Sequence, residues 1–307
     1  MLIRLFVILL FTILSMDGGY AFAGKIYITK EKGLEKQEER LVENFSRQLL
    51  NNLRGKESAF LPAKAAGGLK GHDDIVVALG EGALKEVLRG DGNSPVIGVF
   101  ISRSSYADVL SGVSSRRKVT AVYSDPSPKR QIALIKALLG EGASVGVIKS
   151  SSTEEEVKQA VITAKELGVR MQVADIQRFR NPKLAVDELK GTRTLLLQKD
   201  KELFDSIPLD TLLVLAYDLN NLGIIGYSSG VVKNGALATT YTSLDDTVKS
   251  VADIIREFDS TGKIPVPDYS EYYSVVVNKY VVRSLDIYER DEDAVKKEVA
   301  SLLKEEK

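Results

Sequence analysis

The chain has 307 residues, of which 44% are hydrophobic and 27% are charged, a balance typical of folded globular domains. Lys and Arg together number 42, as do Asp and Glu, so the formal net charge is zero, which argues against a nucleic-acid or anionic-membrane surface. Cysteine is absent, which excludes disulfides, thiolate metal sites, a thiol nucleophile and a lipid-modified cysteine.

The first 23 residues have the three-part pattern of a secretory signal peptide. Arg4 precedes an unbroken apolar run over residues 5–14, and Ala-Phe-Ala at 21–23 forms a small-x-small cleavage site. An uncleaved anchor is the alternative, but a bilayer-spanning helix needs ~20 apolar residues and this run is shorter. Cleavage after Ala23 predicts a mature chain of 284 residues, the 307 less the first 23, in an extracytoplasmic space such as the bacterial periplasm.

Seven short runs that are apolar on both faces follow in chain order. Such strands are typical of a parallel sheet covered by helices on both sides, so we predict an α/β protein built from doubly wound units. The runs are KIYI at 25–28, DIVVALG at 74–80, PVIGVFIS at 95–102, KVTAVYS at 118–124, ASVGVIKS at 143–150, TLLLQ at 194–198 and GIIGYS at 223–228.

Three stripes of apolar residues at helical spacing lie between or after these runs. Ser-Ser-Thr at 151–153 leads into three glutamates, and Ser243 precedes Asp246 by three residues, which are signals of helix starts. The stripes are Ile132, Ile135, Leu138 and Leu139; Val157, Val161, Ala164 and Leu167; and Val248, Val251, Ile255 and Phe258.

Two segments rich in proline interrupt this alternation. SDPSPKR at 124–130 separates a strand from the next helix, and IPVPDYSEYY at 264–273 holds two prolines and three tyrosines without helical spacing. We interpret the first as a break between lobes and the second as a connecting segment, around which Tyr269, Tyr272 and Tyr273 pack.

The stretch VVALGEGALKEVL at 76–88 runs from a strand through two glycines into a helix. A dinucleotide fingerprint needs a third glycine where Lys85 stands, and no Gly-Lys-Ser/Thr follows for a Walker loop. The carboxylate of Glu81 at a helix N-terminus would compete with a phosphate for the same backbone donors. The loop is therefore either a plain turn or part of a cleft for another kind of ligand.

His72, in KGHDD, is the only histidine of the chain. A catalytic triad would have to be built around it, and no Gly-x-Ser-x-Gly elbow accompanies it, so we interpret it as a surface-loop residue and predict that the protein is not an enzyme. No calcium-loop or His-Glu-x-x-His pattern occurs, so neither a metal nor another cofactor is predicted.

Three segments carry a resemblance to a known family. VYSDPSPKRQIALIKALLGEGASVGVI at 122–148, GIIGYSSGVVKNGALATTYTSLDDTVKSVADIIREF at 223–258 and YYSVVVNKYVVRSLDI at 272–287 resemble the ABC-transporter substrate-binding protein family, in particular its periplasmic tryptophan/tyrosine-type branch.

The resemblance implies the leucine-binding type, or type I, periplasmic-binding-protein fold: two doubly wound parallel-sheet lobes, a cleft between them and three crossing segments. Lobe one would comprise 24–122 plus 236–266, and lobe two 123–235 plus 267–307. The crossings would fall near 124–128, near 234–238 and in VPDYSEYY at 266–273.

In such a fold the carboxyl ends of the strands face the cleft and supply its side chains. We expect Arg103 to bind a carboxylate, and Asp125 or Asp200 to bind an ammonium group. Tyr227 and Tyr106 could stack on a cyclic ligand, although packing is the favoured interpretation for both. The candidate ligand-binding residues are Thr29, Gly80, Glu81, Ser102, Arg103, Ser104, Ser124, Asp125, Ser150, Ser151, Asp200, Tyr227 and Ser228.

The leading functional hypothesis is a monomeric extracytoplasmic protein that captures a small polar or zwitterionic ligand for a membrane permease with a separate ATPase. The alternative is a sensory or scaffold protein of the same fold that acts through a partner's ectodomain. An enzyme is the third possibility.

Overall fold

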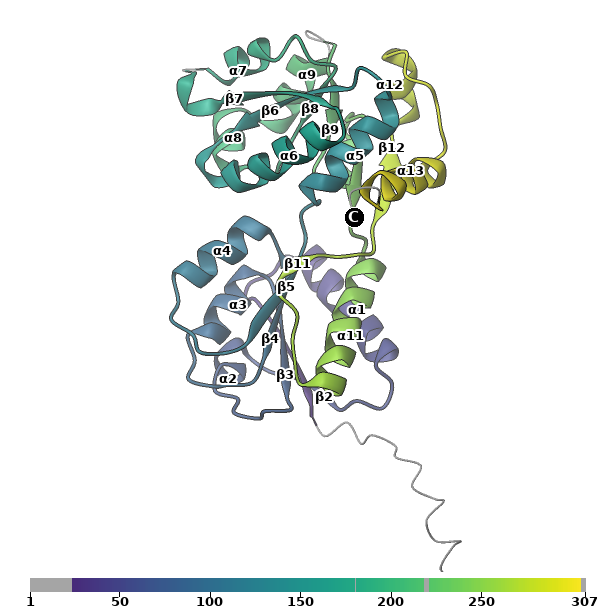
Figure 1. Cartoon of the computed structure of the whole chain (residues 1–307). Coiled ribbons are helices and arrows are strands. Elements are labelled where there is room, and N and C mark those ends of the chain that lie inside the picture. The colour runs from purple at the N-terminus through teal and green to yellow at the C-terminus, as the bar shows by residue number, and fades with distance from the viewer. Residues whose placement is uncertain (1–23, 180, 218–220, 305–307) are drawn as a thin grey trace, which may run out of the picture.

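Two six-stranded sheets, one in each of two lobes, organise the chain (Figure 1). The structure is a computed structural model that describes residues 24–179, 181–217 and 221–304. The predicted signal peptide, residues 1–23, lies outside the described residues. All seven predicted strands are present, and every strand pair is parallel except the pair of β10 with β12, which confirms the predicted α/β class.

The first sheet has the strand order β11-β5-β4-β3-β1-β2. Helices cover it on both faces: α1 and α11 pack on one side, and α2, α3 and α4 on the other. Its strands are β1 (Ile26–Lys30), β2 (Ser58–Phe60), β3 (Ile75–Leu79), β4 (Val96–Ile101), β5 (Val119–Tyr123) and β11 (Asp268–Tyr269). Its helices are α1 (Lys36–Asn52), α2 (Ala63–Ala66), α3 (Glu81–Leu88), α4 (Arg103–Ser111) and α11 (Leu244–Thr261).

The second sheet has the order β12-β10-β9-β8-β6-β7. One face is covered by α5, α6, α12 and α13, and the other by α7 to α10. Its strands are β6 (Ser144–Lys149), β7 (Arg170–Asp175), β8 (Thr194–Leu196), β9 (Gly223–Ile225), β10 (Ala238–Tyr241) and β12 (Ser274–Val277). Its helices are α5 (Pro128–Leu139), α6 (Glu154–Glu166), α7 (Pro182–Glu188), α8 (Lys201–Ser206), α9 (Leu209–Tyr217), α10 (Ser229–Lys233), α12 (Lys279–Ser284) and α13 (Glu292–Lys304).

The predicted apolar stripes of α5 and α11 are confirmed, whereas the stripe of α6 is confirmed in part, because Val161 is 41% exposed and Leu167 directly follows the helix. Ser243 and Asp246 form a reciprocal capping box at the start of α11. α5 ends at Gly140, which has the positive φ of 62° that favours glycine after a helix.

The chain crosses between the lobes three times, and the first and third crossings lie within the segments predicted for them. The first joins β5 to α5 over residues 124–127, and the third joins β11 to β12 over residues 270–273. Tyr269 and Tyr273 pack on either side of the third crossing, in the cores of the first and second lobes respectively, whereas Tyr272 is exposed.

The second crossing lies later than predicted. Residues 238–241, which the sequence analysis placed in lobe one, form β10 of the second sheet, so the chain crosses at 242–243, just before α11. Buried hydrogen bonds fix this strand in the second lobe: the Gln131 side chain donates to the Thr239 hydroxyl and accepts from the Thr240 amide and hydroxyl. The boundary at 267 is also displaced, because β11 pairs with β5 in the first sheet.

No helix among the described residues is long and apolar enough to cross a membrane.

Candidate functional site

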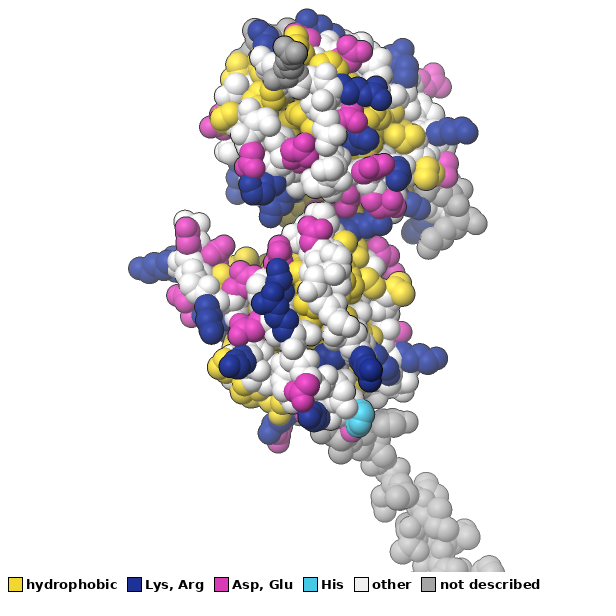
Figure 2. Space-filling view, turned by 90° about the vertical axis from the view of Figure 1, so that its left-hand side faces the viewer, with side chains coloured by type: hydrophobic (Ala, Val, Ile, Leu, Met, Phe, Trp, Pro, Cys, Tyr) yellow, Lys and Arg dark blue, Asp and Glu magenta, His cyan; other side chains and the backbone are white. Residues whose placement is uncertain are grey.

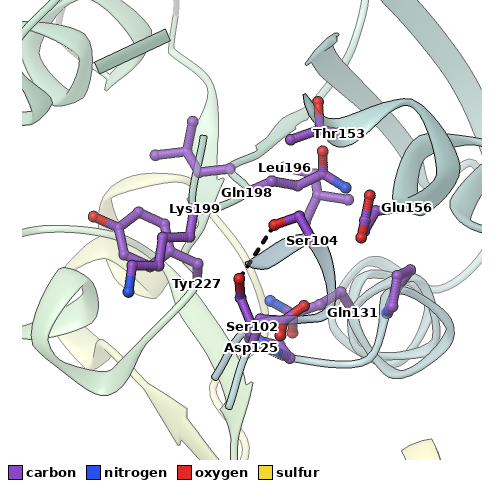
Figure 3. Close-up of a pocket in the computed structure, with 13 residues that line it drawn as sticks. Ser102, Ser104, Asp125, Gln131, Thr153, Glu156, Leu196, Gln198, Lys199 and Tyr227 are labelled. Atoms are coloured by element: carbon purple, nitrogen blue, oxygen red, sulfur yellow. Dashed lines mark hydrogen bonds between the residues drawn. The ribbon is translucent and has the colours of Figure 1, made fainter. Parts of the chain in front are cut away.

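A pocket lies where the first crossing meets the two lobes, beside the carboxyl ends of β4, β5, β8 and β9 (Figure 3). Its volume is about 470 Å³, including space open to solvent. The first lobe contributes two serines, and the crossing and the second lobe contribute the rest. It is lined by Ser102, Ser104, Asp125, Pro126, Pro128, Gln131, Thr153, Glu156, Leu196, Leu197, Gln198, Lys199 and Tyr227.

An irregularity in β4 shapes the first-lobe side of the pocket. The register of β4 with β5 shifts between Gly98 and Ile101, and Phe100 has a φ of 58°, which is unusual for a residue with a side chain. Ser102 follows directly and caps α4, because its hydroxyl accepts a hydrogen bond of 3.1 Å from the Ser105 amide. The Ser104 hydroxyl lies 3.1 Å from that of Ser102 and completes this wall.

Asp125 lies in the first crossing, and two residues of the first lobe, Arg103 and Tyr269, contact its carboxylate. One carboxylate oxygen accepts a 2.9 Å hydrogen bond from the Arg103 amide, and the other lies 3.5 Å from the Tyr269 hydroxyl. Burial raises the pKa of Asp125 above its usual 3.8, although the Arg103 amide opposes this rise. The carboxylate of Asp125 is therefore a partly buried hydrogen-bond acceptor on the pocket wall.

Glu156 and Gln198 face the pocket from the second lobe (Figure 3). Glu156, in the first turn of α6, is only 9% exposed, and burial raises its pKa above the usual 4.5. The Gln198 Oε1 atom is buried and has no hydrogen-bond partner among the described residues. A buried acceptor without a donor is costly, so Oε1 of Gln198 is a candidate for direct contact with a ligand, and the buried carboxylate of Glu156 lies in the same pocket.

Gln131 and Tyr227 form the floor of the pocket. The Gln131 side-chain amide donates to the Gly226 carbonyl at 2.6 Å and accepts from the Thr240 amide at 2.9 Å. This buried bridge fixes the turn that carries Tyr227, whose ring packs against Phe204 with centroids 5.6 Å apart. Gln131 has no free hydrogen-bonding capacity in this arrangement, so it positions the pocket wall.

The structure brings four of the predicted ligand-binding residues into this pocket: Ser102, Ser104, Asp125 and Tyr227. Sequence reasoning missed the three helical residues Gln131, Thr153 and Glu156. The Arg103 side chain lies outside the pocket, where it spans the lobes to Glu155 at 3.6 Å.

Three more predicted residues hold a neighbouring loop together. Asp200 is buried and caps α8, and one of its oxygens lies 3.4 Å from the Thr153 hydroxyl. The Ser150 hydroxyl caps the short helical turn at Ser151–Thr153, and the Ser151 hydroxyl donates to Glu202 at 3.1 Å. Asp200 therefore supports Thr153 on the pocket wall and does not itself line the pocket.

The remaining predicted residues lie away from the pocket. Ser124 and Glu81 are exposed, and Ser228 caps α10. Thr29 is buried in β1, and its hydroxyl has no hydrogen-bond partner among the described residues. Tyr106 is buried against the ring of Tyr123, as the packing interpretation predicts.

The glycine loop at the start of α3 is occupied by a side chain of the protein itself. The Gly82 amide donates to the carboxylate of Glu31, and the same carboxylate lies against Gly80, which has a φ of 94°. The φ of Gly80 favours glycine, and a Cβ there would lie 2.8 Å from the Glu31 carboxylate, which would have to move. One of the donors that an anionic ligand would use at this helix N-terminus, the Gly82 amide, is already engaged.

His72 is exposed in a loop of the first lobe, remote in sequence and fold from the pocket-lining residues. Figure 2 shows cationic and anionic side chains intermixed over both lobes on the displayed face. Among residues 24–179, 181–217 and 221–304, no group of His, Asp and Glu is arranged to hold a metal ion.

The chain matches a family described as ABC transporter substrate binding protein over residues 32–300. One similar solved structure is the ligand-free, open form of a substrate-binding protein with adhesive properties from Clostridium difficile. Its TM-score is 0.64 and its sequence identity is 16%, and the match covers 88% of this chain and 97% of that chain. Another is an ABC domain in complex with L-Trp from Streptococcus pneumonia, with a TM-score of 0.54, 15% identity and coverage of 90% and 98%. At these identities the likeness is one of fold. No curated protein matches the chain significantly.

Proposed function

Because the chain belongs to the ABC transporter substrate-binding protein family, we propose that it captures a small polar or zwitterionic solute between its lobes and delivers it to a membrane permease. The ATPase that drives such a permease would be a separate chain, because no Walker loop occurs in this sequence. The predicted signal peptide supports an extracytoplasmic, periplasmic location for this capture.

The pocket at the first crossing is the observation that carries this proposal. It joins Ser102 and Ser104 of one lobe to Glu156, Gln198 and Tyr227 of the other, so a ligand bound there would contact both lobes. A ligand that contacts both lobes favours their closure, and closure excludes water and strengthens the polar contacts. The Arg103–Glu155 ion pair already spans the lobes beside the pocket.

Thermal unfolding of the purified protein against a panel of amino acids, amines, carboxylates, sugars and nucleosides tests the proposal. A ligand that binds only the folded state at a hundredfold excess over its Kd stabilises that state by about 2.7 kcal/mol. We expect one chemical class to raise the unfolding temperature and, in small-angle scattering, to reduce the radius of gyration as the lobes close.

Two tyrosine variants provide the matched comparison. Tyr227→Ala should weaken binding because it removes part of the pocket floor, whereas Tyr288→Ala should leave binding unchanged because Tyr288 is 83% exposed and lies outside the pocket. Absence of a shift with every class would contradict solute capture and favour the sensory or scaffold alternative.

A further inference from the structure

The pocket wall offers strong hydrogen-bond acceptors to a ligand, beside the donors of Lys199, Tyr227 and the Gln198 side-chain amide. The Gln131 amide is satisfied within the protein, and the Thr153 hydroxyl accepts from the Ser150 amide and lies 3.4 Å from Asp200. The Ser102 hydroxyl accepts from the Ser105 amide. Three strong acceptors then remain for a ligand: the carboxylate of Glu156, part of the carboxylate of Asp125, and Oε1 of Gln198.

These acceptors differ from an ordinary cluster of surface carboxylates. Glu156 is nine-tenths buried, and its carboxylate accepts a hydrogen bond from its own backbone amide. Oε1 of Gln198 is fully buried and has no hydrogen-bond partner among the described residues. Figure 3 shows Glu156 and Gln198 on the side of the pocket near Thr153, with Ser102 and Asp125 on the other side. A donor that entered the pocket would give Oε1 of Gln198 its missing partner and would meet the buried carboxylate of Glu156.

Neither of the two cationic side chains near the pocket forms an ion pair with Asp125 or Glu156 in the part of the chain that the structure describes. Arg103 lowers the pKa of both Asp125 and Glu156 through its charge, but its guanidinium pairs with Glu155 at 3.6 Å and faces a separate groove. Lys199 lines the pocket as an exposed side chain. The effect of burial exceeds that of Arg103, since the pKa of each carboxyl group is raised.

A carboxylate on the ligand would find no buried cation among the described residues of the pocket. Arg103 lies outside the pocket, Lys199 lines it as an exposed side chain, and the Gly82 amide at the start of α3 is engaged by Glu31. An ammonium or guanidinium group has only donors, and hydrogen bonds between a cation and a carboxylate are among the strongest in proteins.

On the basis of the proposed solute-binding function, we infer that the pocket recognises a protonated amine or guanidinium group, with Glu156, Asp125 and Oε1 of Gln198 as its acceptors. The ligand's cationic group, and not a carboxylate, determines binding. Solutes that carry the cation alone bind at least as tightly as the corresponding amino acids.

Calorimetric titration with matched compounds tests this selectivity. Tryptamine, tryptophan and indole-3-propionate share a ring system and differ in their amine and carboxylate groups; agmatine, putrescine, succinate and glucose extend the comparison to other shapes. We expect binding by at least one of the amines or guanidines that lack a carboxylate, and none by indole-3-propionate, succinate or glucose.

Charge-removing variants identify the acceptor. Glu156→Gln keeps the size of the side chain and should weaken binding of the cation about tenfold or more, because a hydrogen bond to a charged group is lost. Glu154→Gln is the matched control in the same helix turn, where the exposed carboxylate pairs with Lys158, and should change affinity less than twofold. Gln198→Met, which removes the acceptor Oε1, should weaken binding severalfold.

The outcomes separate this inference from the proposed function. Binding of a carboxylate or sugar without any amine would overturn the inference while upholding solute capture. An unchanged affinity of Glu156→Gln for the bound amine, with its fold verified by circular dichroism, would also overturn it. Failure of every compound class to bind would overturn solute capture itself.

Discussion

Replacing Gln131 by leucine tests whether the buried amide bridge holds the pocket floor. The Thr240 amide and hydroxyl donate to Oε1 of Gln131 at 2.9 and 3.0 Å, and all of these groups are buried. Gln131→Leu leaves both Thr240 groups without that partner, whereas the Gly226 carbonyl still accepts from the Thr239 hydroxyl at 2.6 Å. Since each unsatisfied buried group costs about 1–3 kcal/mol, the free energy of unfolding should fall by about 2–6 kcal/mol.

Urea denaturation with linear extrapolation measures this loss. The matched control is Gln159→Leu on the neighbouring helix α6, where the half-buried side chain lies outside the bridge and the change should stay within about 0.5 kcal/mol. A loss below about 1 kcal/mol for Gln131→Leu, together with unaltered ligand affinity, would show that the bridge does not support the turn at Tyr227.

Three further predictions concern charged groups. Lys56→Met should lower the free energy of unfolding by about 3–5 kcal/mol in urea titrations, because the partner carboxylate of Asp259 is only 12% exposed and would lose its cation; a neutral result would mean that water reaches Asp259. Glu31→Ala should cost about 0.5–1 kcal/mol by removing the acceptor of the Gly82 amide at the start of α3, measured in the same way. Glu156→Gln should stabilise the unliganded protein at neutral pH: the pKa of Glu156 is higher in the folded state, so its ionisation destabilises the fold above that pKa. The difference from the wild type should vanish as the pH falls to about 4, and a difference that grows on acidification would refute this sign.

Continuous apolar runs predicted the strands that are buried on both faces. Two missed strands, β7 and β10, lack such runs, whereas the missed strand β12 has only the short run Val275–Val277. β7 is an edge strand that pairs only with β6, and its sequence RMQVAD is largely exposed. β10 is buried, but two of its four residues are threonines. Because their hydroxyls bond to Gln131 and to the Gly226 carbonyl, which are distant in sequence, the strand could not be recognised locally.

The site was partly predictable for a similar reason. Ser102, Asp125 and Tyr227 follow directly after predicted strands, and the carboxyl ends of parallel strands face the cleft. Residues on helices gave a weaker signal. Gln131 lies four residues before Ile135 on an apolar helix stripe, and a polar residue at such a position indicates a buried hydrogen-bond network.

Glu156 could not be distinguished by sequence from its two acidic neighbours. Three consecutive glutamates begin α6, and all three favour a helix N-terminus equally. Successive side chains point about 100° apart around a helix, so only one of the three can face a given surface. Packing of α6 against the rest of the second lobe determines that this residue is Glu156, and that its neighbours Glu154 and Glu155 face solvent and Arg103.

The start of α3 and the pocket at the first crossing treat charge in opposite ways. At the start of α3, Glu31 supplies an anion to the Gly82 amide, so this amide needs no ligand. At the first crossing, burial raises the pKa of Asp125 and Glu156, and Oε1 of Gln198 has no donor among the described residues, so the pocket is incomplete. A buried acceptor without a donor lowers the stability of the unliganded protein. A ligand that supplies the donor removes this cost, so its binding free energy becomes more favourable by a related amount. The same atoms that make the unliganded protein less stable would give the pocket its preference for a cation.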